Sequence, residues 1–399
     1  MSKDKKRLVP VRRFKEFENA DAWEQRKLGD MGNVITGNTP STKDKSNWTT
    51  DKNKGHIWIT PTDINRKVLF DSERYLSDKG WLKARKIPKN SVLITSIASI
   101  GKNAINGIDA AFNQQINALI LQNNNYYFVL SLMDKEKKRF EALAGQTATP
   151  IINKSTFSSF QLQIPSENEQ NKIGNFFKKI DNLITLHQRK LDKLKRVKSA
   201  YLTEMFPAEG EREPKRRFPG FTGAWEQRKL GEVVEITMGQ SPSSKNYTEN
   251  PNDHILVQGN ADMKNGYVVP RVWTTQITKQ AEKGDLILSV RAPVGDIGKT
   301  DYDVVLGRGV AAIKGNSFIF QLLTKMKING YWTRFSTGST FESINSDNIK
   351  NAQISIPSLR EQEKIGGLFN EFDSLIALHQ RKLDKLQKLK NAYLNEMFV

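Results

Sequence analysis

Hydrophobic residues alternate at spacings of three and four along residues 166–206, and the same rhythm returns along residues 358–399. A heptad rhythm sustained over four repeats predicts a long helix that packs against another helix. The predicted seam positions are Ile173, Phe177, Ile180, Ile184, His187, Leu191 and Leu194 in the first helix, and Ile365, Phe369, Phe372, Ile376, His379, Leu383 and Leu386 in the second.

A helix of about 40 residues is a rod of roughly 60 Å and cannot bury its own apolar stripe. The nearest partner is the other helix of the same chain. We expect an antiparallel coiled coil, because a two-fold relation between repeated halves lets identical faces meet, with the two globular domains at opposite ends. Ser166 and Glu169 are expected to form a capping box at the start of the first helix. His187 and His379 are either a polar layer that fixes the register or partly exposed positions of little consequence.

The remaining segments predict α+β domains over residues 1–165 and 208–357, with helical spacers at 166–207 and 358–399. Strands are expected at 34–36, 56–60 and 91–95 and at their counterparts 233–237, 254–258 and 284–289. Helices are expected at 127–143 and 318–331. The tripeptides Ile100-Gly101-Lys102 and Ile297-Gly298-Lys299 predict a turn that both domains share.

The two halves repeat some segments without change. Residues 22–29 (AWEQRKLG) return as residues 224–231, and residues 186–194 (LHQRKLDKL) return as residues 378–386. The segments between these copies agree only in outline. An internal repeat with a constant frame and different inserts predicts two domains that recognise two different things.

Composition narrows the class of partner. The chain has 62 Lys and Arg against 43 Asp and Glu, a net charge of +19, and it has no cysteine. Such a basic excess favours a nucleic-acid partner, although a lysine-rich proteome would also produce it. A charged membrane surface fits less well, because no basic amphipathic helix with an aromatic face appears. No secretory signal and no apolar run of membrane-spanning length is apparent, so we expect a cytoplasmic protein without a membrane contact.

Polar residues in the glycine-bearing turns are the candidate DNA contacts, since Arg and Lys can bind guanine and Asn and Gln can bind adenine in the major groove. Any one of them is also consistent with a phosphate contact or a solvated loop residue. The candidates are Asn38, Thr39, Ser41, Lys43, Lys45, Lys102, Gln114 and Gln115 in the first domain, and Gln240, Ser241, Ser243, Lys245, Arg291, Lys299, Arg308, Ser339 and Thr340 in the second.

Enzyme motifs are incomplete. Residues 291–300 (RAPVGDIGKT) end like a phosphate-binding loop, but Pro293 occupies a position that requires glycine, so we interpret the segment as a turn between strands. Residues 307–312 resemble a dinucleotide fingerprint that no helix follows, and a strand is the better interpretation. The four histidines have no metal-ligand spacing. We therefore predict no catalytic residue and no metal site.

These motifs together resemble the specificity subunit of type I restriction–modification systems. The similarity rests on the WEQRKLG motif at Trp23 and Trp225, the Gly-x-[Thr/Ser]-Pro-Ser turns at Gly37 and Gly239, and the IPSxxxEQxKIG motif at Ile164 and Ile356. It also rests on the helices that end Ala-Tyr-Leu-x-Glu-Met-Phe, and on Gly338-Ser339-Thr340, for which the first half has Gly145-Gln146-Thr147. The similarity extends over nearly the whole chain.

The resemblance implies two target recognition domains that each read one half of a split, asymmetric site in double-stranded DNA. It implies that the helices set the gap between the half-sites and dock two methyltransferase subunits. S-adenosylmethionine would be used by those subunits, and ATP and Mg²⁺ by two restriction–translocase subunits, with no cofactor on this chain. The alternatives are a duplicated DNA-binding regulator unrelated to restriction and a self-contained methyltransferase–nuclease.

Overall fold

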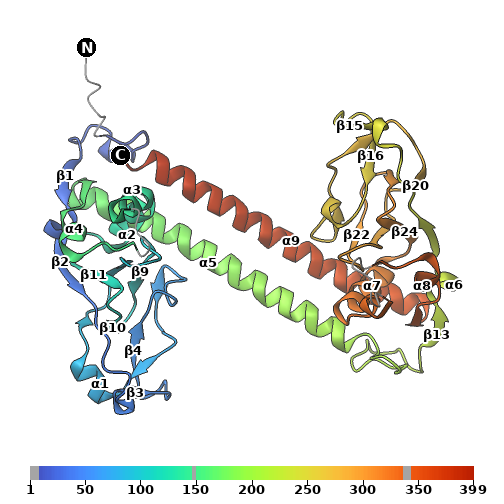
Figure 1. Cartoon of the computed structure of the whole chain (residues 1–399), viewed down its shortest axis with the longest axis horizontal. Helices are drawn as coiled ribbons and strands as arrows, with labels where there is room; N and C mark the ends of the chain where they lie inside the picture. Colours follow the sequence, from blue (N-terminus) through green and yellow to red (C-terminus); the bar gives the residue numbers. More distant parts are fainter. Residues whose placement is uncertain (1–8, 146–149, 336–342) are drawn as a thin grey trace. The chain divides into compact units, whose positions relative to one another are not determined.

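The computed structural model describes residues 9–145, 150–335 and 343–399. Contacts divide the chain into a first unit, residues 1–189 with 380–399, and a second unit, residues 190–379. Each unit contains one α+β domain and parts of two 38-residue helices, α5 (Glu167–Glu204) and α9 (Leu359–Glu396) (Figure 1). Each helix begins one residue after its expected start and ends three residues before its expected end.

The first unit contains two five-stranded sheets of short strands. In spatial order the first sheet is β2 (Gly32–Thr36), β11 (Ile116–Leu121), β8 (Val92–Thr95), β9 (Asn103–Asn106) and β5 (Val68–Leu69). The second is β3 (Trp48–Thr49), β6 (Tyr75–Leu76), β4 (His56–Ile59), β10 (Ala110–Phe112) and β7 (Lys86–Ile87). Its short helices are α1 (Asp78–Lys83), α2 (Tyr126–Lys135), α3 (Lys137–Glu141) and α4 (Lys154–Ser159).

The second unit repeats this strand order. One sheet is β14 (Glu235–Met238), β24 (Val310–Lys314), β21 (Leu286–Ser289), β22 (Ile297–Lys299), β18 (Tyr267–Val268) and the additional β17 (Met263–Lys264). The other is β15 (Tyr247–Thr248), β19 (Trp273–Thr274), β16 (His254–Val257), β23 (Val304–Leu306) and β20 (Lys279–Ala281). Its short helices are α6 (Leu230–Val233), α7 (Ser317–Ile328) and α8 (Ser346–Lys350).

The repeated WEQRKLG motif forms the base of each domain. Its EQRK segments are β1 (Glu24–Lys27) and β13 (Glu226–Lys229), which pair antiparallel with β12 (Gln161–Ile164) and β25 (Gln353–Ile356) just before the long helices. Trp23 and Trp225 are almost fully buried in the two cores. The motif therefore connects each domain to the long helix that follows it.

Each core is completed by residues just beyond the end of a long helix from the other half of the sequence. In the first unit, Phe398 packs its ring on Trp23 and Phe177, 6.0 and 5.5 Å away between ring centroids. In the second unit, Phe206 packs in the same way on Trp225 and Phe369. Within each unit, the start of one long helix therefore lies antiparallel beside the end of the other.

Ion pairs join these helix segments, buried in the first unit and half-buried in the second. In the first unit the Lys390 ammonium lies 2.8 Å from the Asp181 carboxylate, and in the second unit Lys198 lies 2.6 Å from Asp373. The Tyr127 hydroxyl also donates to Asp181, and burial followed by the charge of Asp181 raises the pKa of Tyr127, so the phenol stays protonated. Identical pairs at equivalent positions indicate that the repeat extends to the contacts between helices.

The expected capping box is replaced by a different contact. Glu169 is almost fully buried, and its carboxylate accepts two hydrogen bonds from the guanidinium of Arg13, each 2.7 Å long. Glu361 accepts the same pair of bonds from Arg217. The Arg-Arg-Phe segments at residues 12–14 and 216–218 are thus a further repeated motif that the sequence analysis did not use. They clamp the segment before each domain onto a long helix.

Several short elements differ from expectation. Residues 297–299 form strand β22, so the shared turn predicted there was wrong. The true counterpart of residues 100–102 is residues 294–296, because Gly101 and Gly295 both have positive φ and donate to the carbonyls of Thr95 and Ser289. Residues 307–309 form the turn between β23 and β24 and are not a strand. Val233, the first residue of the strand predicted at 233–237, is instead the last residue of helix α6, and strand β14 begins at Glu235.

Candidate nucleic-acid interface

The glycine-bearing turn after β2 packs closely on the turn between β10 and β11. The backbone amide of Asn38 donates to the carbonyl of Phe112, and a Cβ on Gly37 would lie only 2.4 Å from that same carbonyl oxygen. The contact brings the hydroxyl of Thr39 within hydrogen-bond distance of Gln114. Glycine is thus required for an approach that places two candidate segments, distant in sequence, side by side.

The second unit builds the same junction from other side chains. The backbone amide of Gln240 donates to the carbonyl of Leu306. A Cβ on Gly239 would lie 2.1 Å from the carbonyl oxygen of Gly307. The amide of Arg308 donates to the Ser241 hydroxyl over 3.0 Å, while the Arg308 side chain is exposed. A Thr–Gln pair in one domain therefore corresponds to a Ser–Arg pair in the other.

A third loop joins the junction in each domain. The amide of Ser96 donates to the carbonyl of Gln115, and the amide of Val290 donates to that of Gly309. Arg291 is exposed directly beside this contact. We call these three loops together the loop edge: residues 37–45, 96–102 and 113–115 in the first unit, and residues 239–245, 290–296 and 307–309 in the second.

Most of the candidate contacts lie on this loop edge. Ser41, Lys43, Lys45 and Lys102 are exposed on it in the first unit, and Ser243 and Lys245 in the second. Lys299 is an exception, because it belongs to strand β22 and lines a groove beside α7 with Lys198 and Lys327. Ser339 and Thr340 lie outside the described residues.

Two tryptophans that the sequence analysis did not select brace the first turn. The indole nitrogen of Trp58 donates to the carbonyl of Asn38 over 3.0 Å, and that of Trp48 donates to the carbonyl of Ser41 over 3.2 Å. The side chain of Asn38 bonds to the backbone of Lys83 and Arg85. The side-chain amide of Asn38 therefore stabilises the fold, whereas the side chain of Gln114 is exposed beside Thr39.

The second unit braces its turn without tryptophan. The hydroxyl of Thr278 donates to the carbonyl of Gln240, and the side-chain oxygen of Gln276 accepts from the amide of Ser243. Both residues lie between β19 and β20, which correspond to β6 and β7 of the first unit. The two loop edges therefore share a backbone design and differ in the side chains that hold them.

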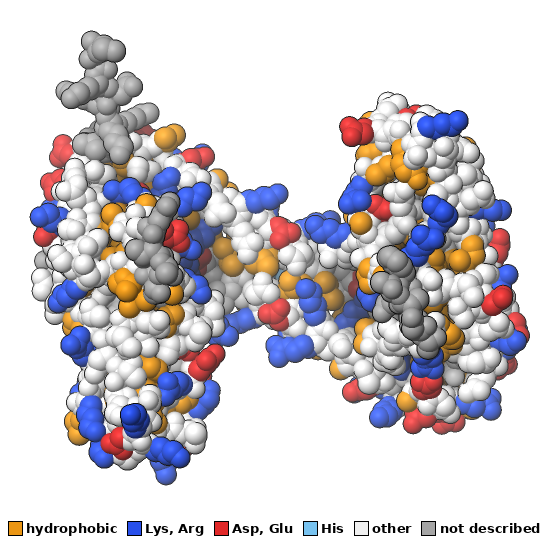
Figure 2. Space-filling view, in the orientation of Figure 1, with side chains coloured by type: hydrophobic (Ala, Val, Ile, Leu, Met, Phe, Trp, Pro, Cys, Tyr) orange, Lys and Arg blue, Asp and Glu red, His pale blue; other side chains and the backbone are white. Residues whose placement is uncertain are grey.

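The surroundings of the first loop edge are cationic. Lys43, Lys45, Lys79, Lys83, Arg85 and Lys86 are all exposed there. Asp44 lies among them, and hydrogen bonding to the Ser46 hydroxyl, with help from Lys79, lowers the pKa of its carboxyl to about 2. Figure 2 shows Lys and Arg side chains gathered at the end of this unit that carries α1 and β3. Such a surface suits a phosphate backbone.

Comparison with known proteins identifies the family. A model of the type I restriction modification DNA specificity domain matches residues 20–196 and again residues 223–388. The chain belongs to this family. It is similar to a putative type I restriction enzyme MjaX specificity subunit of Methanocaldococcus jannaschii, with 27% identity over 95% of this chain and 93% of that protein. It is also similar to the EcoprrI specificity subunit of Escherichia coli, with 23% identity over 87% of each chain.

The fold of this specificity subunit agrees with a solved structure. A crystal structure of the type I restriction–modification S subunit from M. genitalium superposes with a TM-score of 0.71 at 14% identity, covering 98% of this chain and 99% of that one. Two copies of the family domain in one chain account for the repeated motifs. The specificity subunit is thus a duplicated DNA-specificity module joined by long helices.

The predicted seam positions lie on the inward side of the helices of this specificity subunit. Among them, Ile173, Phe177, Ile180, Leu191, Ile365, Phe369 and Leu383 are buried, and Ile184, His187, Leu194, Phe372, Ile376, His379 and Leu386 are half-buried. Four of the buried positions, Ile173, Phe177, Ile365 and Phe369, also belong to the domain cores.

Each domain forms a groove with the long helix that follows it. The groove of the first unit has a volume of 790 Å³ and includes Phe70, Tyr126, Arg189 and Leu186. The groove of the second unit has 630 Å³ and includes Tyr267, Phe320 and Ile328. The helix beside each groove exposes a leucine pair: Leu183 and Leu186 on α5, and Leu375 and Leu378 on α9. Exposed apolar side chains at equivalent positions are typical of protein docking surfaces.

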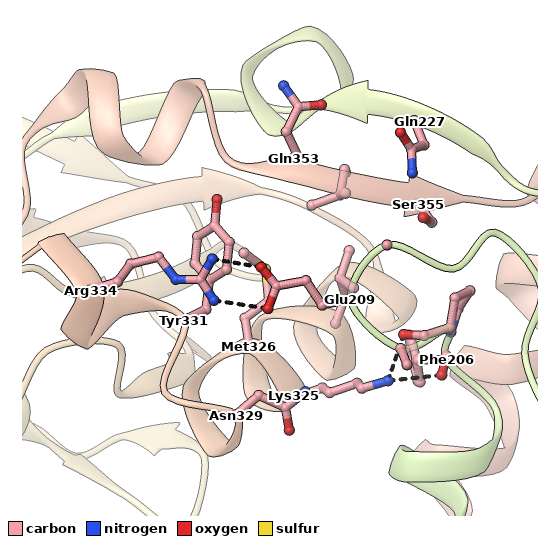
Figure 3. Close-up of a pocket in the computed structure, with 15 residues that line it drawn as sticks. Phe206, Glu209, Gln227, Lys325, Met326, Asn329, Tyr331, Arg334, Gln353 and Ser355 are labelled. Atoms are coloured by element: carbon pink, nitrogen blue, oxygen red, sulfur yellow. Dashed lines mark hydrogen bonds and ion pairs between the residues drawn. The ribbon is translucent and has the colours of Figure 1, made fainter.

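A smaller pocket of 260 Å³ in the second unit has a structural explanation. The ammonium of Lys325 donates to the carbonyls of Phe206 and Pro207, just beyond the end of α5, and Arg334 forms an ion pair with Glu209 at its mouth (Figure 3). Burial lowers the pKa of Lys325. A cation at a helix C-terminus satisfies carbonyls that the helix leaves free. The pocket does not include residues of the loop edge.

No helix among the described residues is long and apolar enough to cross a membrane. In the same described part of the chain, no group of three or more His, Asp or Glu side chains could hold a metal ion. Residues 291–296 connect β21 to β22, and residues 297–299 continue as a strand. The geometry of a phosphate-binding loop, which leads into a helix, is therefore not formed by this segment.

Proposed function

We propose that each loop edge reads one half of a two-part, asymmetric DNA sequence. The observation that supports this proposal is that the two units repeat the same backbone arrangement but carry different side chains on it. The strand order and turn contacts repeat between the units, while the side chains on the turns change from Thr39 and the exposed Gln114 to Ser241 and the exposed Arg308. Gln can bind adenine and Arg can bind guanine in the major groove, so the two edges suit different base sequences.

The chain itself serves as a recognition and assembly subunit without catalytic chemistry of its own. S-adenosylmethionine would be used by methyltransferase subunits that modify adenine, and ATP and Mg²⁺ by restriction–translocase subunits. Phosphate contacts by the cationic loop edges release counterions, so affinity should fall steeply as salt concentration rises. Helices α5 and α9 would fix the gap between the two half-sites.

The two grooves are the proposed docking places for two methyltransferase subunits, one at each groove. The equivalent leucine pairs on α5 and α9 support a stoichiometry of two. Leu186→Asp should release one methyltransferase subunit, and Leu186→Asp combined with Leu378→Asp should release both, as measured by native mass spectrometry. Leu389→Asp is the matched control, because Leu389 is exposed on α9 but lies outside both leucine pairs and both grooves. Loss of a subunit in the control would argue against grooves as the docking places.

Domain exchange tests the reading function. Residues 25–164 are replaced by the equivalent insert of another family member, and the complex with methyltransferase subunits is expressed in a methylation-free host. Sequencing of methylated adenines should show a two-part motif in which one half changes and the other is kept. A change in both halves, or a wild-type complex that methylates no two-part motif, would contradict the proposal.

A further inference from the structure

In each domain, the connection that holds the first turn of the loop edge exposes a branched aliphatic side chain. Leu82, in α1, is 77% exposed, and Ile277 is 49% exposed. Leu82 lies between β6 and β7, and Ile277 lies between β19 and β20, which are the equivalent strands of the second unit. The first connection includes a helix and the second does not. An exposed aliphatic residue is therefore present at the same place although the backbone around it differs.

The neighbours of both residues hold the first turn of the loop edge. Lys83, next to Leu82, accepts a hydrogen bond from the side chain of Asn38 at its carbonyl. Gln276 and Thr278, on either side of Ile277, bond to Ser243 and Gln240. Leu82 and Ile277 are thus fixed to the turns that carry the candidate polar readers.

The charge around Leu82 identifies the kind of partner. Lys79 and Lys83 share the carboxylate of Asp44, while Arg85 and Lys86 add two further exposed cations. This surface complements a polyanion. Between the phosphates of double-stranded DNA, the apolar group displayed in the major groove is the C5 methyl of thymine, and aliphatic side chains contact it.

We propose that Leu82 and Ile277 each contact the methyl group of a thymine, one in each half-site. The inference rests on the proposed function, since it requires that each loop edge lie in the major groove. In this proposal, each loop edge uses polar side chains to hydrogen-bond to bases and one aliphatic side chain to contact a thymine methyl group. The aliphatic contact selects thymine over cytosine and over uracil, which has the same hydrogen-bonding edge without the methyl.

The test uses the complex with methyltransferase subunits and DNA that carries the wild-type motif. Thymines of one half-site at a time are replaced by uracil, and affinity is measured by competition. Loss of one methyl contact should weaken wild-type binding about fivefold for either half-site. Leu82→Ala should bind unmodified DNA about fivefold more weakly and become insensitive to uracil in the first half-site, yet remain sensitive in the second. Ile277→Ala should show the converse.

Leu359→Ala is the matched control, because Leu359 is 71% exposed at the start of α9 and lies outside the loop edges. It should keep the wild-type response to uracil in both half-sites. A Leu82→Ala complex that loses the same factor as wild type on uracil substitution would overturn the proposal, as would a first half-site without thymine. Misfolding of the variant would instead abolish the response to both half-sites. Failure of the proposed function is separate, since wild type would then prefer no two-part motif.

Discussion

Trp58 illustrates how single buried residues position the loop edge. Its indole donates to the carbonyl of Asn38, and its ring is almost fully buried. Trp58→Phe removes this donor and keeps most of the ring, so the turn loses about 1–3 kcal/mol of support. We expect lower selectivity in the first half-site and unchanged selectivity in the second, measured by sequencing DNA selected by the complex.

Trp23→Phe is the appropriate control for that experiment. Trp23 is also buried in the first unit, but its indole nitrogen has no hydrogen-bond partner among the described residues. The substitution should alter packing and leave the half-site selectivity unchanged. An equal loss of selectivity in both variants would indicate a general loss of stability.

Asp134 makes the stability of the first unit depend on pH. Its carboxylate lies 2.5 Å from the Lys67 ammonium and 3.4 Å from that of Lys390. Burial alone would raise the pKa of Asp134, but the two ammonium groups outweigh burial and lower it. The stabilising contribution is therefore complete above the ordinary aspartate pKa of about 3.9 and is lost as pH falls through the lower folded-state pKa.

Urea unfolding between pH 5 and pH 2 can measure this contribution. The free energy of unfolding of the first unit should decrease over that range, and Asp134→Asn should make the decrease smaller. Asp301→Asn changes an exposed carboxylate of the second unit and should leave the pH dependence of the first unit as in wild type. A wild-type slope in Asp134→Asn would mean that other carboxylates account for the effect.

At the scale of elements, residues just beyond the ends of the long helices belong to the domain cores. Phe398 lies in the core of the first unit and Phe206 in that of the second. Replacing either by Ala should cost about 3–5 kcal/mol through lost burial and a residual cavity. Hydrogen exchange should show loss of protection in the first unit for Phe398→Ala and in the second for Phe206→Ala. Leu389→Ala, at an exposed position of α9, should change neither.

The long helices could be predicted closely, because the heptad pattern of their apolar residues is local and can be read directly from the sequence. The domains were harder, since many strands contain two to four residues and depend on neighbours distant in sequence. Matching Ile297-Gly298-Lys299 to Ile100-Gly101-Lys102 by their letters misplaced a turn. The structural match follows positive φ and hydrogen bonding at Gly101 and Gly295, which the letters do not reveal.

The candidate site was predictable only in part, because its turns are local in sequence but their meeting point is not. The glycine-bearing turns pointed to Thr39, Gln114 and Arg308 as polar loop residues. That three separate loops meet at one edge follows from strand order, which the sequence analysis did not derive. Trp58 and Leu82 had no repeated motif to distinguish them, because their counterparts in the second domain, Leu256 and the segment around Ile277, differ in type.

For the whole molecule, the length of α5 and α9 is expected to set the gap in the DNA target. Adding one heptad to both helices within the repeated LHQRKLDKL segments lengthens each by roughly 10 Å, equivalent to about three base pairs. The expected result is a longer gap between unchanged half-sites, or loss of methylation, as measured by methylome sequencing. A heptad added to α5 alone mismatches the pairing and should abolish activity. Full activity with the original gap would contradict this role of the helices.

The participation of residues 380–399 in the first unit has a consequence for biosynthesis. The ribosome makes residues 1–189 first, but their core lacks Leu394, Met397 and Phe398 until residues 380–399 have been made. The buried core of the second unit uses residues 202–369, so all of its residues are made before those that complete the first core. At typical elongation rates, the earlier-made domain waits about 10–40 s for its last residues. Completion of the first domain thus departs from the usual order from N- to C-terminus, and a chain released early would leave that domain open to proteases.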